Sequence, residues 1–339
     1  MNLPVKLSFA HLPTPLEPLD RLSAHLGGAN IWIKRDDQTG LATGGNKTRK
    51  LEYLLAEAQA NGAQTIITCG APQSNHCRQT AAAAAKCGYR CILVLSGDPP
   101  AKMTGNLLLD ELLGAEIVWS HAETRETVMQ RMYAQEQAAG NTPYLIPLGG
   151  SNRVGAAGYA AAVQELADQL NSPLPSDATP DRRGVRGEGF SRILFASSSG
   201  GTHAGLAVGA KAMLPNTEVL GLSVDEPLEV LKSNVARIAN ETAAWLGLPF
   251  TFAPADISAN ADYIGAGYAL MGDREHETIR LLARLEGILV DPVYTGKALG
   301  GLIDLIRKGA IGKDERVLFW HTGGGPALFA YGDQLMSQG

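Results

Sequence analysis

Short apolar segments alternate with helical patterns along most of this 339-residue chain. Each segment runs into a polar, glycine-bearing loop, as TIITCG and RILFASSSGG do. We predict eight buried strands, at residues 65–70, 90–97, 115–120, 143–150, 192–201, 218–224, 287–296 and 316–325. Buried strands that alternate with helices are typical of parallel sheets in an α/β fold. Because ligands bind at the carboxyl ends of such strands, we expect the functional residues in the loops that follow them.

The composition fits a globular protein of about two domains and disfavours several partners. Hydrophobic residues make up 45% of the chain and charged residues 19%. The formal net charge of −5 argues against nucleic acid as a partner, because phosphate binding needs a basic surface. No apolar run is long enough to span a membrane, and the first residues lack the continuous apolar stretch of a signal peptide. We therefore expect a protein of the cytoplasm with no membrane partner.

The four cysteines, at positions 69, 77, 87 and 91, form no CxxC pair. Their spacing fits no zinc signature, so we expect no metal site and interpret them as reduced thiols that are mostly buried. Residues 171–189, NSPLPSDATPDRRGVRGEG, are rich in proline, glycine and charge and almost free of apolar side chains. We predict that this segment is an inserted surface loop that is dispensable for folding and activity.

Three cations crowd into the first turn of a predicted helix in GGNKTRKLEYLL, residues 44–55. Asn46 is the candidate N-cap, and Lys47, Arg49 and Lys50 follow it. A helix N-terminus favours acidic side chains, so this end is unfavourable for cations. Either the three side chains point into water, or an anion binds there and one lysine is held for chemistry.

A second candidate site is ASSSGGTHAGLAVG, residues 196–209, where a strand runs through a glycine loop into a helix of small residues. Converging backbone N–H groups and a helix N-terminus make a phosphate cup. The loop lacks the GK[ST] of a Walker A motif, and its glycine spacing does not match GxGxxG, although Asp225 follows the next strand. The alternative is a tight turn whose small residues permit close packing.

Polar side chains at or near other predicted strand ends could have either a functional or a purely structural role. In GAPQSNHCRQTAAAAAKCG, residues 70–88, Ser74 or Asn75 can cap a helix whose free N–H groups could bind a carboxylate. Tyr294 in LVDPVYTGK and Tyr268 in IGAGYALM could transfer protons, or their hydroxyls could be hydrogen-bonded in the core.

Together these motifs resemble one family. GGNKTRKLE, GAPQSNH, SSSGGTHAG, GILVDPVYTGK and HTGGGPALF, preceded by IKRDD at 33–37, occur in the same order in pyridoxal-phosphate enzymes grouped with D-cysteine desulfhydrase and 1-aminocyclopropane-1-carboxylate deaminase. The resemblance covers residues 8–331, apart from the segment 171–189. It implies a two-domain, tryptophan-synthase-β-like fold (fold type II) with pyridoxal 5′-phosphate between the domains. The large domain would comprise residues 1–51 and 156–339, and the small domain residues 52–155.

The resemblance also implies roles for individual residues. Lys47 would bond covalently to the cofactor aldehyde and later remove the substrate α-proton. Lys50 and the cup of Ser199, Gly200, Gly201 and Thr202 would bind the cofactor phosphate. Asn75 would lie beside the 3′-oxygen of the cofactor, and Thr322 would meet its pyridine nitrogen. The substrate would bind at Ser74, Asn75 and His76, with its carboxylate at Ser74 and the adjacent helix N-terminus. Tyr268 and Tyr294 would lie beside the reacting carbon. Arg49 has no role in this scheme beyond solvent exposure or a salt bridge.

Two positions bear on the reaction within this family. Deaminases that resemble this chain usually have glutamate where it has Thr295 and glutamine where it has His76. A neutral hydroxyl stabilises protonation of the pyridine nitrogen less than a carboxylate does, which suits elimination of a good leaving group. We therefore predict β-elimination from D-cysteine, with release of sulfide, pyruvate and ammonia.

Alternatives within the family are a lyase that removes sulfite from L-cysteate and the cyclopropane deaminase. More distant alternatives are a nicotinamide-dependent oxidoreductase that uses residues 196–209 with Asp225, and a non-catalytic binding protein. Members of the family commonly form homodimers, which is also our expectation here.

Overall fold

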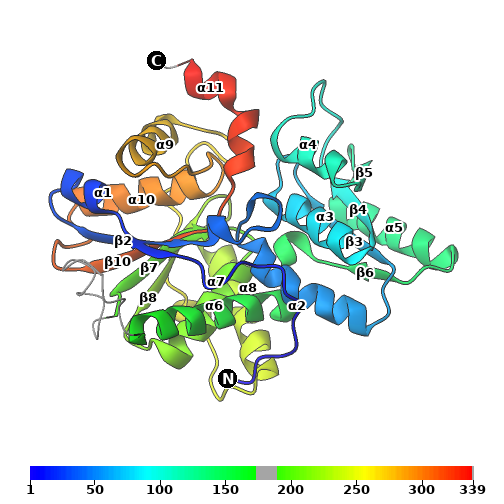
Figure 1. The fold of residues 1–339 in the computed structure, drawn as a ribbon, viewed down its shortest axis with the longest axis horizontal. Coiled ribbons are helices and arrows are strands. Elements are labelled where there is room, and N and C mark those ends of the chain that lie inside the picture. Colours follow the sequence, from blue (N-terminus) through cyan, green and yellow to red (C-terminus); the bar gives the residue numbers. More distant parts are fainter. Residues whose placement is uncertain (173–188, 338–339) are drawn as a thin grey trace.

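The structure is a computed structural model that describes residues 1–172 and 189–337. The chain forms two lobes, each built on its own sheet, with the termini on opposite sides of the larger lobe (Figure 1). The fold is α/β with parallel-rich sheets, as the sequence predicts. The residue bounds given above for the two domains stay a prediction.

The larger sheet has six strands in the order β1-β2-β10-β7-β8-β9. All neighbouring pairs are parallel except β1 and β2. Their bounds are β1 Leu16–Pro18, β2 Asn30–Arg35, β7 Arg192–Ser197, β8 Glu218–Ser223, β9 Ala259–Asn260 and β10 Arg316–His321. The order brings the ends of β7, β8 and β10 together at one edge of the sheet.

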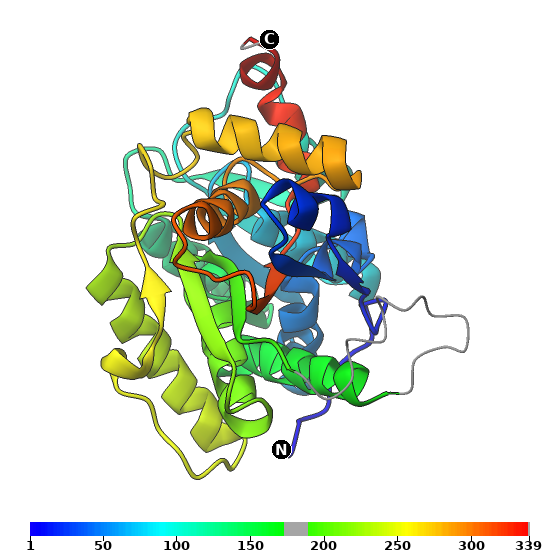
Figure 2. The same cartoon turned by 90° about the vertical axis from the view of Figure 1, so that its left-hand side faces the viewer.

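Helices cover both faces of this sheet (Figures 1 and 2). On one face lie α1 (Asp20–His25), α9 (Asp273–Glu286) and α10 (Thr295–Arg307), which share a core with β2, β7, β8 and β10. On the other face lie α6 (Arg153–Asn171) and α7 (Gly201–Met213). A further helix, α8 (Leu228–Trp245), packs on the outside of α6 and α7.

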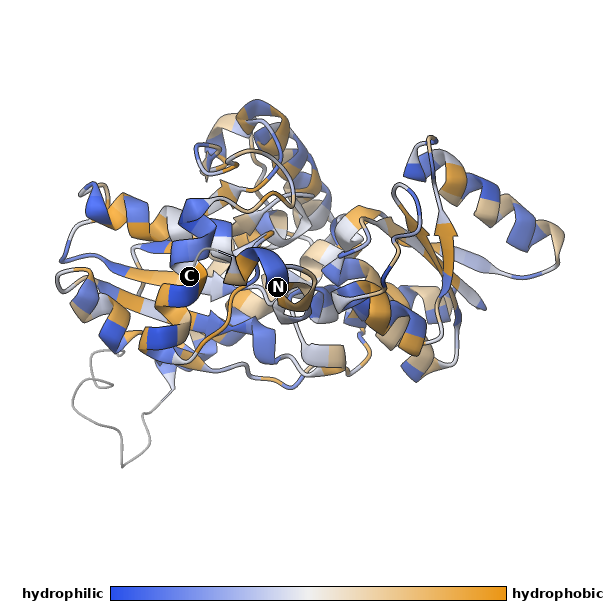
Figure 3. Ribbon diagram, turned by 90° about the horizontal axis from the view of Figure 1, so that it is seen from above, coloured by the Kyte–Doolittle hydropathy of each residue, from blue (hydrophilic) through white to orange (hydrophobic). Residues whose placement is uncertain are grey.

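The smaller sheet is wholly parallel, in the order β5-β4-β3-β6. Its strands are β3 Thr65–Gly70, β4 Arg90–Leu95, β5 Glu116–Trp119 and β6 Pro143–Leu145. The helices α2 (Lys47–Ala60), α3 (Asn75–Cys87) and α4 (Gly105–Leu112) pack on the face that Ile66 and Leu93 share. Helix α5 (Arg125–Ala138) covers the face that Ile67 and Val94 share, as the two-residue period of a strand requires. Figure 3 shows these strands as largely hydrophobic ribbons between helices of mixed character.

Short elements complete the chain. They are the 3₁₀ turns Asp36–Gln38, Leu41–Thr43, Leu148–Gly150, Pro254–Asp256 and Gly325–Ala330, and the terminal helix α11 (Gly332–Met336).

Seven of the eight predicted strands contain the observed strands β3 to β8 and β10, although several end earlier than predicted. The prediction of a strand at 287–296 is wrong. Ile288 and Val290 are apolar because they pack into the core of the larger lobe, not because they pair in a sheet. The Asp291 carboxylate accepts hydrogen bonds from the backbone N–H groups of residues 293, 294 and 295, which favours a turn into α10 over an extended strand.

All four cysteines are free, and three of them are buried on α3, β3 and β4, as predicted. No described helix is both long and apolar enough to cross a membrane. The prediction of an inserted surface loop at 171–189 falls on residues 173–188, which lie outside the described residues.

Candidate active site

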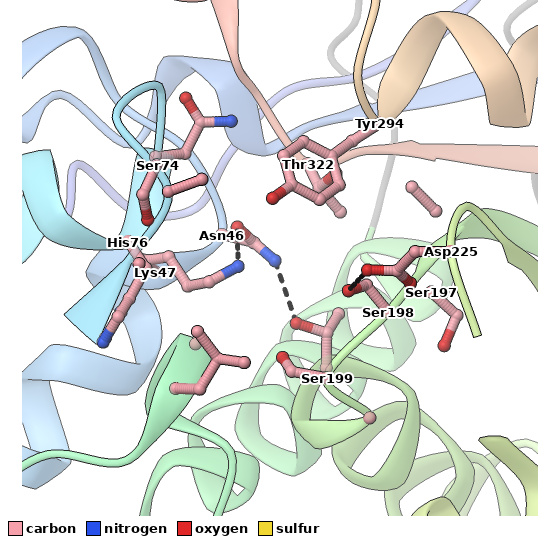
Figure 4. A pocket seen from close by; sticks show the side chains of 18 of the residues that line it. Asn46, Lys47, Ser74, His76, Ser197, Ser198, Ser199, Asp225, Tyr294 and Thr322 are labelled. Atoms are coloured by element: carbon pink, nitrogen blue, oxygen red, sulfur yellow. Dashed lines mark hydrogen bonds between the residues drawn. The ribbon is translucent and has the colours of Figure 1, made fainter. Parts of the chain in front are cut away.

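One pocket lies between the two lobes, at the carboxyl ends of strands from both sheets (Figure 4). Ten of the twelve residues predicted to form the site line it: Lys47, Ser74, Asn75, His76, Ser199, Gly200, Thr202, Tyr268, Tyr294 and Thr322. The other two, Lys50 and Gly201, do not line the pocket but lie close to each other beside it. A Cβ added to Gly201 would stand 2.8 Å from the Lys50 Nζ.

Lys47 begins α2 and points into the pocket (Figure 4). Its Nζ donates to the Asn46 Oδ1 at 3.1 Å. Loss of solvation and, to a lesser extent, the nearby Arg78 guanidinium lower the pKa of Lys47 to about 8, against the opposing effect of Asp291. A substantial fraction of this amine is therefore neutral near neutral pH, as a nucleophile or a general base requires.

The N-cap position of α2 predicted for Asn46 is confirmed, although the side chain of this residue caps no backbone N–H group. Its Nδ2 instead donates to the Thr202 Oγ1 at 2.9 Å, on the far wall of the pocket. Gly44 and Gly45, both with positive φ, turn the chain so that the Asn46 N–H reaches the carbonyl of Thr322 at the end of β10.

The other two cations of this turn are also buried, so exposure to water does not explain them. Arg49 forms ion pairs with Asp36 at 2.8 Å and Glu165 at 2.9 Å, which is the salt bridge left open for it above. Lys50 donates to the carbonyl of Gly149 at 3.0 Å. Burial, and then the charge of Lys47, hold the pKa of Lys50 well below its usual range.

The loop after β7 forms a concave wall at the N-terminus of α7. Gly200 caps the helix with a φ of 84°, and the Gly201 N–H donates to the Ser151 Oγ at 3.1 Å. The Ser151 and Ser199 hydroxyls are 2.8 Å apart, and Lys50 lies behind them. Backbone N–H groups, hydroxyls, a lysine and a helix N-terminus together make a wall that suits an anion.

Residues of the turn after β3 form the opposite wall. Ser74 caps α3, and its Oγ accepts from the Cys77 N–H at 3.2 Å, as predicted. The His76 Nε2 lies 2.9 Å from the Thr68 Oγ1, while its Nδ1 has no hydrogen-bond partner among the described residues. Burial, together with Lys47 and Lys50, holds the pKa of His76 well below its usual range, so the ring is neutral.

The third side of the pocket carries two tyrosines and a carboxylate. The hydroxyls of Tyr268 and Tyr294 are 2.6 Å apart, and burial raises the pKa of Tyr268 to about 12. Asp225 follows β8 and accepts from the Ser198 Oγ at 2.7 Å, while its Oδ1 has no described partner. Burial raises the pKa of Asp225. Thr295 does not line the pocket, because its hydroxyl donates to Asp291 at 2.7 Å.

Sequence reasoning missed several residues of the site. Asn46 and Arg125 line the pocket, and Arg78 contacts Asn75 from below. The sequence-based predictions include Asp225 only in the nicotinamide-dependent alternative. Arg78 could have been suspected because it lies one helical turn after Ser74, whereas Arg125 belongs to a charged segment with no motif.

Comparison with known proteins gives consistent results. Residues 7–323 match the family described as pyridoxal-phosphate dependent enzyme. The chain belongs to this family. It is 44% identical over 334 residues to the D-cysteine desulfhydrases of Salmonella typhimurium and Salmonella enteritidis, with 96% of each chain covered.

Solved structures extend the comparison. A protein described as an ACC deaminase homologue is 38% identical, with a TM-score of 0.85 over 98% of this chain and 95% of that one. Threonine deaminase isoform 2 from Solanum lycopersicum shares the fold alone, at 16% identity and a TM-score of 0.64 over 97% of this chain and 85% of that one.

The pocket of this family member fits its cofactor. Lys47, Lys50 and Arg78 bring three buried or half-buried cations to one site, and the α7 N-terminus adds positive potential. Of the described carboxylates near them, Asp291 is already occupied by four hydrogen bonds from its own turn. The site therefore suits a ligand with a phosphate and an aldehyde that reacts with a lysine amine.

Proposed function

We propose that this protein is a pyridoxal-phosphate-dependent lyase that eliminates sulfide from D-cysteine and yields pyruvate and ammonia. The observation that carries the proposal is the Lys47 amine, which has a lowered pKa and lies in the pocket between an anion-binding wall and the turn of Ser74. Full-length relatives named D-cysteine desulfhydrase support the choice of substrate. Bound at Lys47, the cofactor would take up the electron pair left when the substrate α-proton is removed.

In this proposal the lysine at the start of α2 has two tasks. Its Nζ would hold the cofactor through the aldehyde, and the same amine would accept the α-proton of the substrate. A pKa near 8 suits both tasks at neutral pH, because the neutral amine is accessible and can still hold the proton. Lys50, Ser199, Gly200, Gly201 and Thr202 bind the cofactor phosphate.

The substrate carboxylate binds at the N-terminus of α3, where Ser74 leaves backbone N–H groups free. Asn75 and His76 complete this side of the substrate site. Tyr268 and Tyr294 stand beside the reacting carbon with their hydroxyls hydrogen-bonded to each other, so one of them can donate a proton to the leaving group. Both hydroxyls keep their protons at neutral pH, since burial raises the pKa of each phenol.

Elimination is favoured over ring opening because the position of Thr295 supplies no carboxylate to the pocket. Thr322 is the proposed hydroxyl partner of the pyridine nitrogen, and Asp225 and Glu226 are the acidic side chains that line the pocket. Since burial raises the pKa of Asp225, it is a weaker source of negative charge than an exposed acid. A thiolate leaving group demands less of the ring than cleavage of a carbon-carbon bond does.

Arg125 favours a second candidate, the release of sulfite from L-cysteate. It lies at the start of α5 on the pocket wall and forms no hydrogen bond or ion pair with the part of the chain that the structure describes. A guanidinium in this position could bind the sulfonate of the substrate. The neighbouring acids Asp225 and Glu226, which line the same pocket, oppose a second negative charge and keep D-cysteine first.

We also propose that the protein is a cytoplasmic homodimer. The domains that enclose the pocket are residues 1–51 with 156–339, and residues 52–155. Size-exclusion chromatography with light scattering tests the homodimer directly.

A substrate panel tests the proposed reaction. Purified protein saturated with pyridoxal phosphate is assayed for pyruvate release from D-cysteine, L-cysteine, L-cysteate and 1-aminocyclopropane-1-carboxylate. We expect the highest kcat/KM for D-cysteine and the lowest for the cyclopropane compound. Lys47→Ala should abolish pyruvate release and the visible band of lysine-bound cofactor while the protein stays folded. The cyclopropane compound as the best substrate would refute the argument from Thr295, and L-cysteate as the best would favour the Arg125 candidate.

A further inference from the structure

A buried arginine with only neutral partners lies beneath the pocket. Arg78, on α3, is fully buried. Its Nη1 donates to the side-chain oxygens of Asn75 at 3.0 Å and Asn106 at 2.6 Å, and its Nη2 donates to the carbonyl of Gly44 at 2.7 Å. No carboxylate of the described chain lies within ion-pair distance of it. Because buried charges are costly unless they are paired, this arrangement calls for a reason.

The network determines how the Asn75 amide is oriented. Arg78 has donors only, so the Asn75 oxygen must face it. The same oxygen accepts a second hydrogen bond, from the Asn106 Nδ2 at 2.9 Å. Asn106 is itself fixed by the turn, because its Nδ2 also donates to the carbonyl of Gln73 at 2.8 Å. The Asn75 Nδ2, which has no partner among the described residues, is left on the pocket side as a hydrogen-bond donor.

Arg78 also joins the two turns that carry the proposed catalytic groups. Gly44 precedes Lys47 by three residues, and Asn75 follows Ser74 directly. A single guanidinium therefore ties the start of α2 to the start of α3 across the pocket floor. Its charge acts on the Lys47 amine as well. Three other charged or titratable groups interact with Lys47. Asp291 favours the ammonium form of Lys47, whereas the positive charge of Lys47 disfavours the protonated forms of Lys50 and His76.

We propose that Arg78 is a positioning residue, which directs the Asn75 amide donor into the pocket and places an uncompensated positive charge near the Lys47 amine. The proposal rests on the proposed function, since it takes pyridoxal phosphate as the group that Asn75 and Lys47 meet. Asp110, the buried acid on the neighbouring helix, does not cancel the charge at neutral pH, because burial raises its pKa to about 8.

Three variants separate the two effects. Arg78→Met removes both the charge and the hydrogen bonds, whereas Arg78→Lys keeps the charge and loses the planar fork that reaches Asn75, Asn106 and Gly44 together. Arg90→Met is the matched control, because Arg90 is an arginine of the same lobe that forms ion pairs with Glu116 and Glu136. Neither Arg90 nor these two partners lines the pocket. Thermal unfolding establishes that each variant is folded.

Two measurements on apo-protein serve as readouts besides activity. The first is the Kd of pyridoxal phosphate, followed by its absorption. The second is the pH midpoint of reductive methylation at Lys47, followed by peptide mapping. We expect Arg78→Met to raise the Kd by about tenfold to a hundredfold, the usual effect of losing charged hydrogen bonds. It should also raise the midpoint of Lys47 above its wild-type value near 8.

Arg78→Lys should raise the Kd but leave the Lys47 midpoint close to that of the wild type, and Arg90→Met should change neither. An unchanged Kd and midpoint in folded Arg78→Met would overturn the proposal. Should Arg78→Met not fold, an Arg78→Lys variant with the wild-type Kd would overturn the orienting role. Failure of the wild-type protein itself to bind pyridoxal phosphate would instead contradict the proposed function, so the two failures are distinguishable.

Discussion

The carboxyl group of Asp110, on α4, is buried and accepts no hydrogen bond from any residue that the structure describes. A carboxylate in such surroundings loses its hydration without compensation, which raises its pKa to about 8 despite the charge of Arg78. In the unfolded chain the same group titrates near 4. Between these two pH values the unfolded state loses a proton that the folded state keeps, so folding becomes less favourable as the pH rises.

We therefore predict that Asp110→Asn removes a pH dependence of stability. The wild-type free energy of unfolding should fall between about pH 4 and pH 8 by an amount on the order of a few kcal/mol. The variant should show a smaller fall over the same range. Urea unfolding at pH 5 and pH 8 measures this difference, and Asp98→Asn at an exposed position is the control. Parallel curves for the wild type and Asp110→Asn would contradict the prediction.

At this scale the sequence predicts residue type better than residue contact. Lys47, Ser74 and the glycine cup could be predicted because each stands in a motif, Lys47 at the start of a helix and the other two after a strand. Asn46 stands at the predicted N-cap position, but the contact of its side chain could not be predicted because its partner, Thr202, is 156 residues away in the chain. Arg78 went unnoticed for the same reason, since its contacts with Gly44 and Asn106 exist only in the folded chain.

At the scale of elements, a buried ionic network joins α2, α6 and the turn after β2. Arg49 contacts Asp36 and Glu165, and Asp36 also accepts hydrogen bonds from Tyr159 at 2.6 Å and Trp320 at 2.8 Å. The donors, above all Arg49, hold the pKa of Asp36 at about 2 despite complete burial. The network fixes the first turn of α2, and therefore the lysine that begins it, against the larger lobe.

Breaking this network should destabilise the whole protein. We predict that Arg49→Met lowers the free energy of unfolding by about 3–5 kcal/mol, because it leaves buried carboxylates without their main partner. Arg237→Met, which removes an exposed ion pair with Glu241 on α8, should change it by less than about 1 kcal/mol. Denaturant unfolding of both variants provides the comparison. An equal loss of unfolding free energy in the two variants would show that the buried network stabilises the protein no more than an exposed ion pair does.

Periodicity predicted most strands, and it failed at 287–296 for a definable reason. Apolar side chains report burial, and a buried turn is as apolar as a buried strand. The Asp-Pro pair at 291–292 is a turn signal within that segment, and the Asp291 side chain is what ends the extended conformation there. Strand β2 was missed because its apolar run is only three residues long and is followed by the charged residues Lys34 and Arg35, whose partners lie in other elements.

At the scale of the whole molecule, the pocket is made by both lobes, so a ligand that fills it binds the folded chain and not the unfolded chain. Lys47 and Ser74 lie on one side, while Ser199, Asp225 and Thr322 come from loops of the larger lobe (Figure 4). Unfolding either lobe removes part of the site. Binding of the cofactor should therefore stabilise the two lobes together, by about 2.7 kcal/mol at a free ligand concentration of 100 times Kd.

Removal of the cofactor should accordingly lower Tm. The recovery of Tm when a ligand is added back should have two separate contributions, one from the phosphate and one from the bond to Lys47. We predict that pyridoxal phosphate raises the Tm of apo-protein more than pyridoxal does at the same concentration, because pyridoxal leaves Lys50 and the α7 N-terminus without an anion. Lys47→Ala should keep part of the shift caused by pyridoxal phosphate and lose the shift caused by pyridoxal, which depends on the covalent bond. Differential scanning calorimetry gives both shifts. If pyridoxal and pyridoxal phosphate stabilised the wild-type protein equally, the wall around Ser199 and Gly200 would not be a phosphate site.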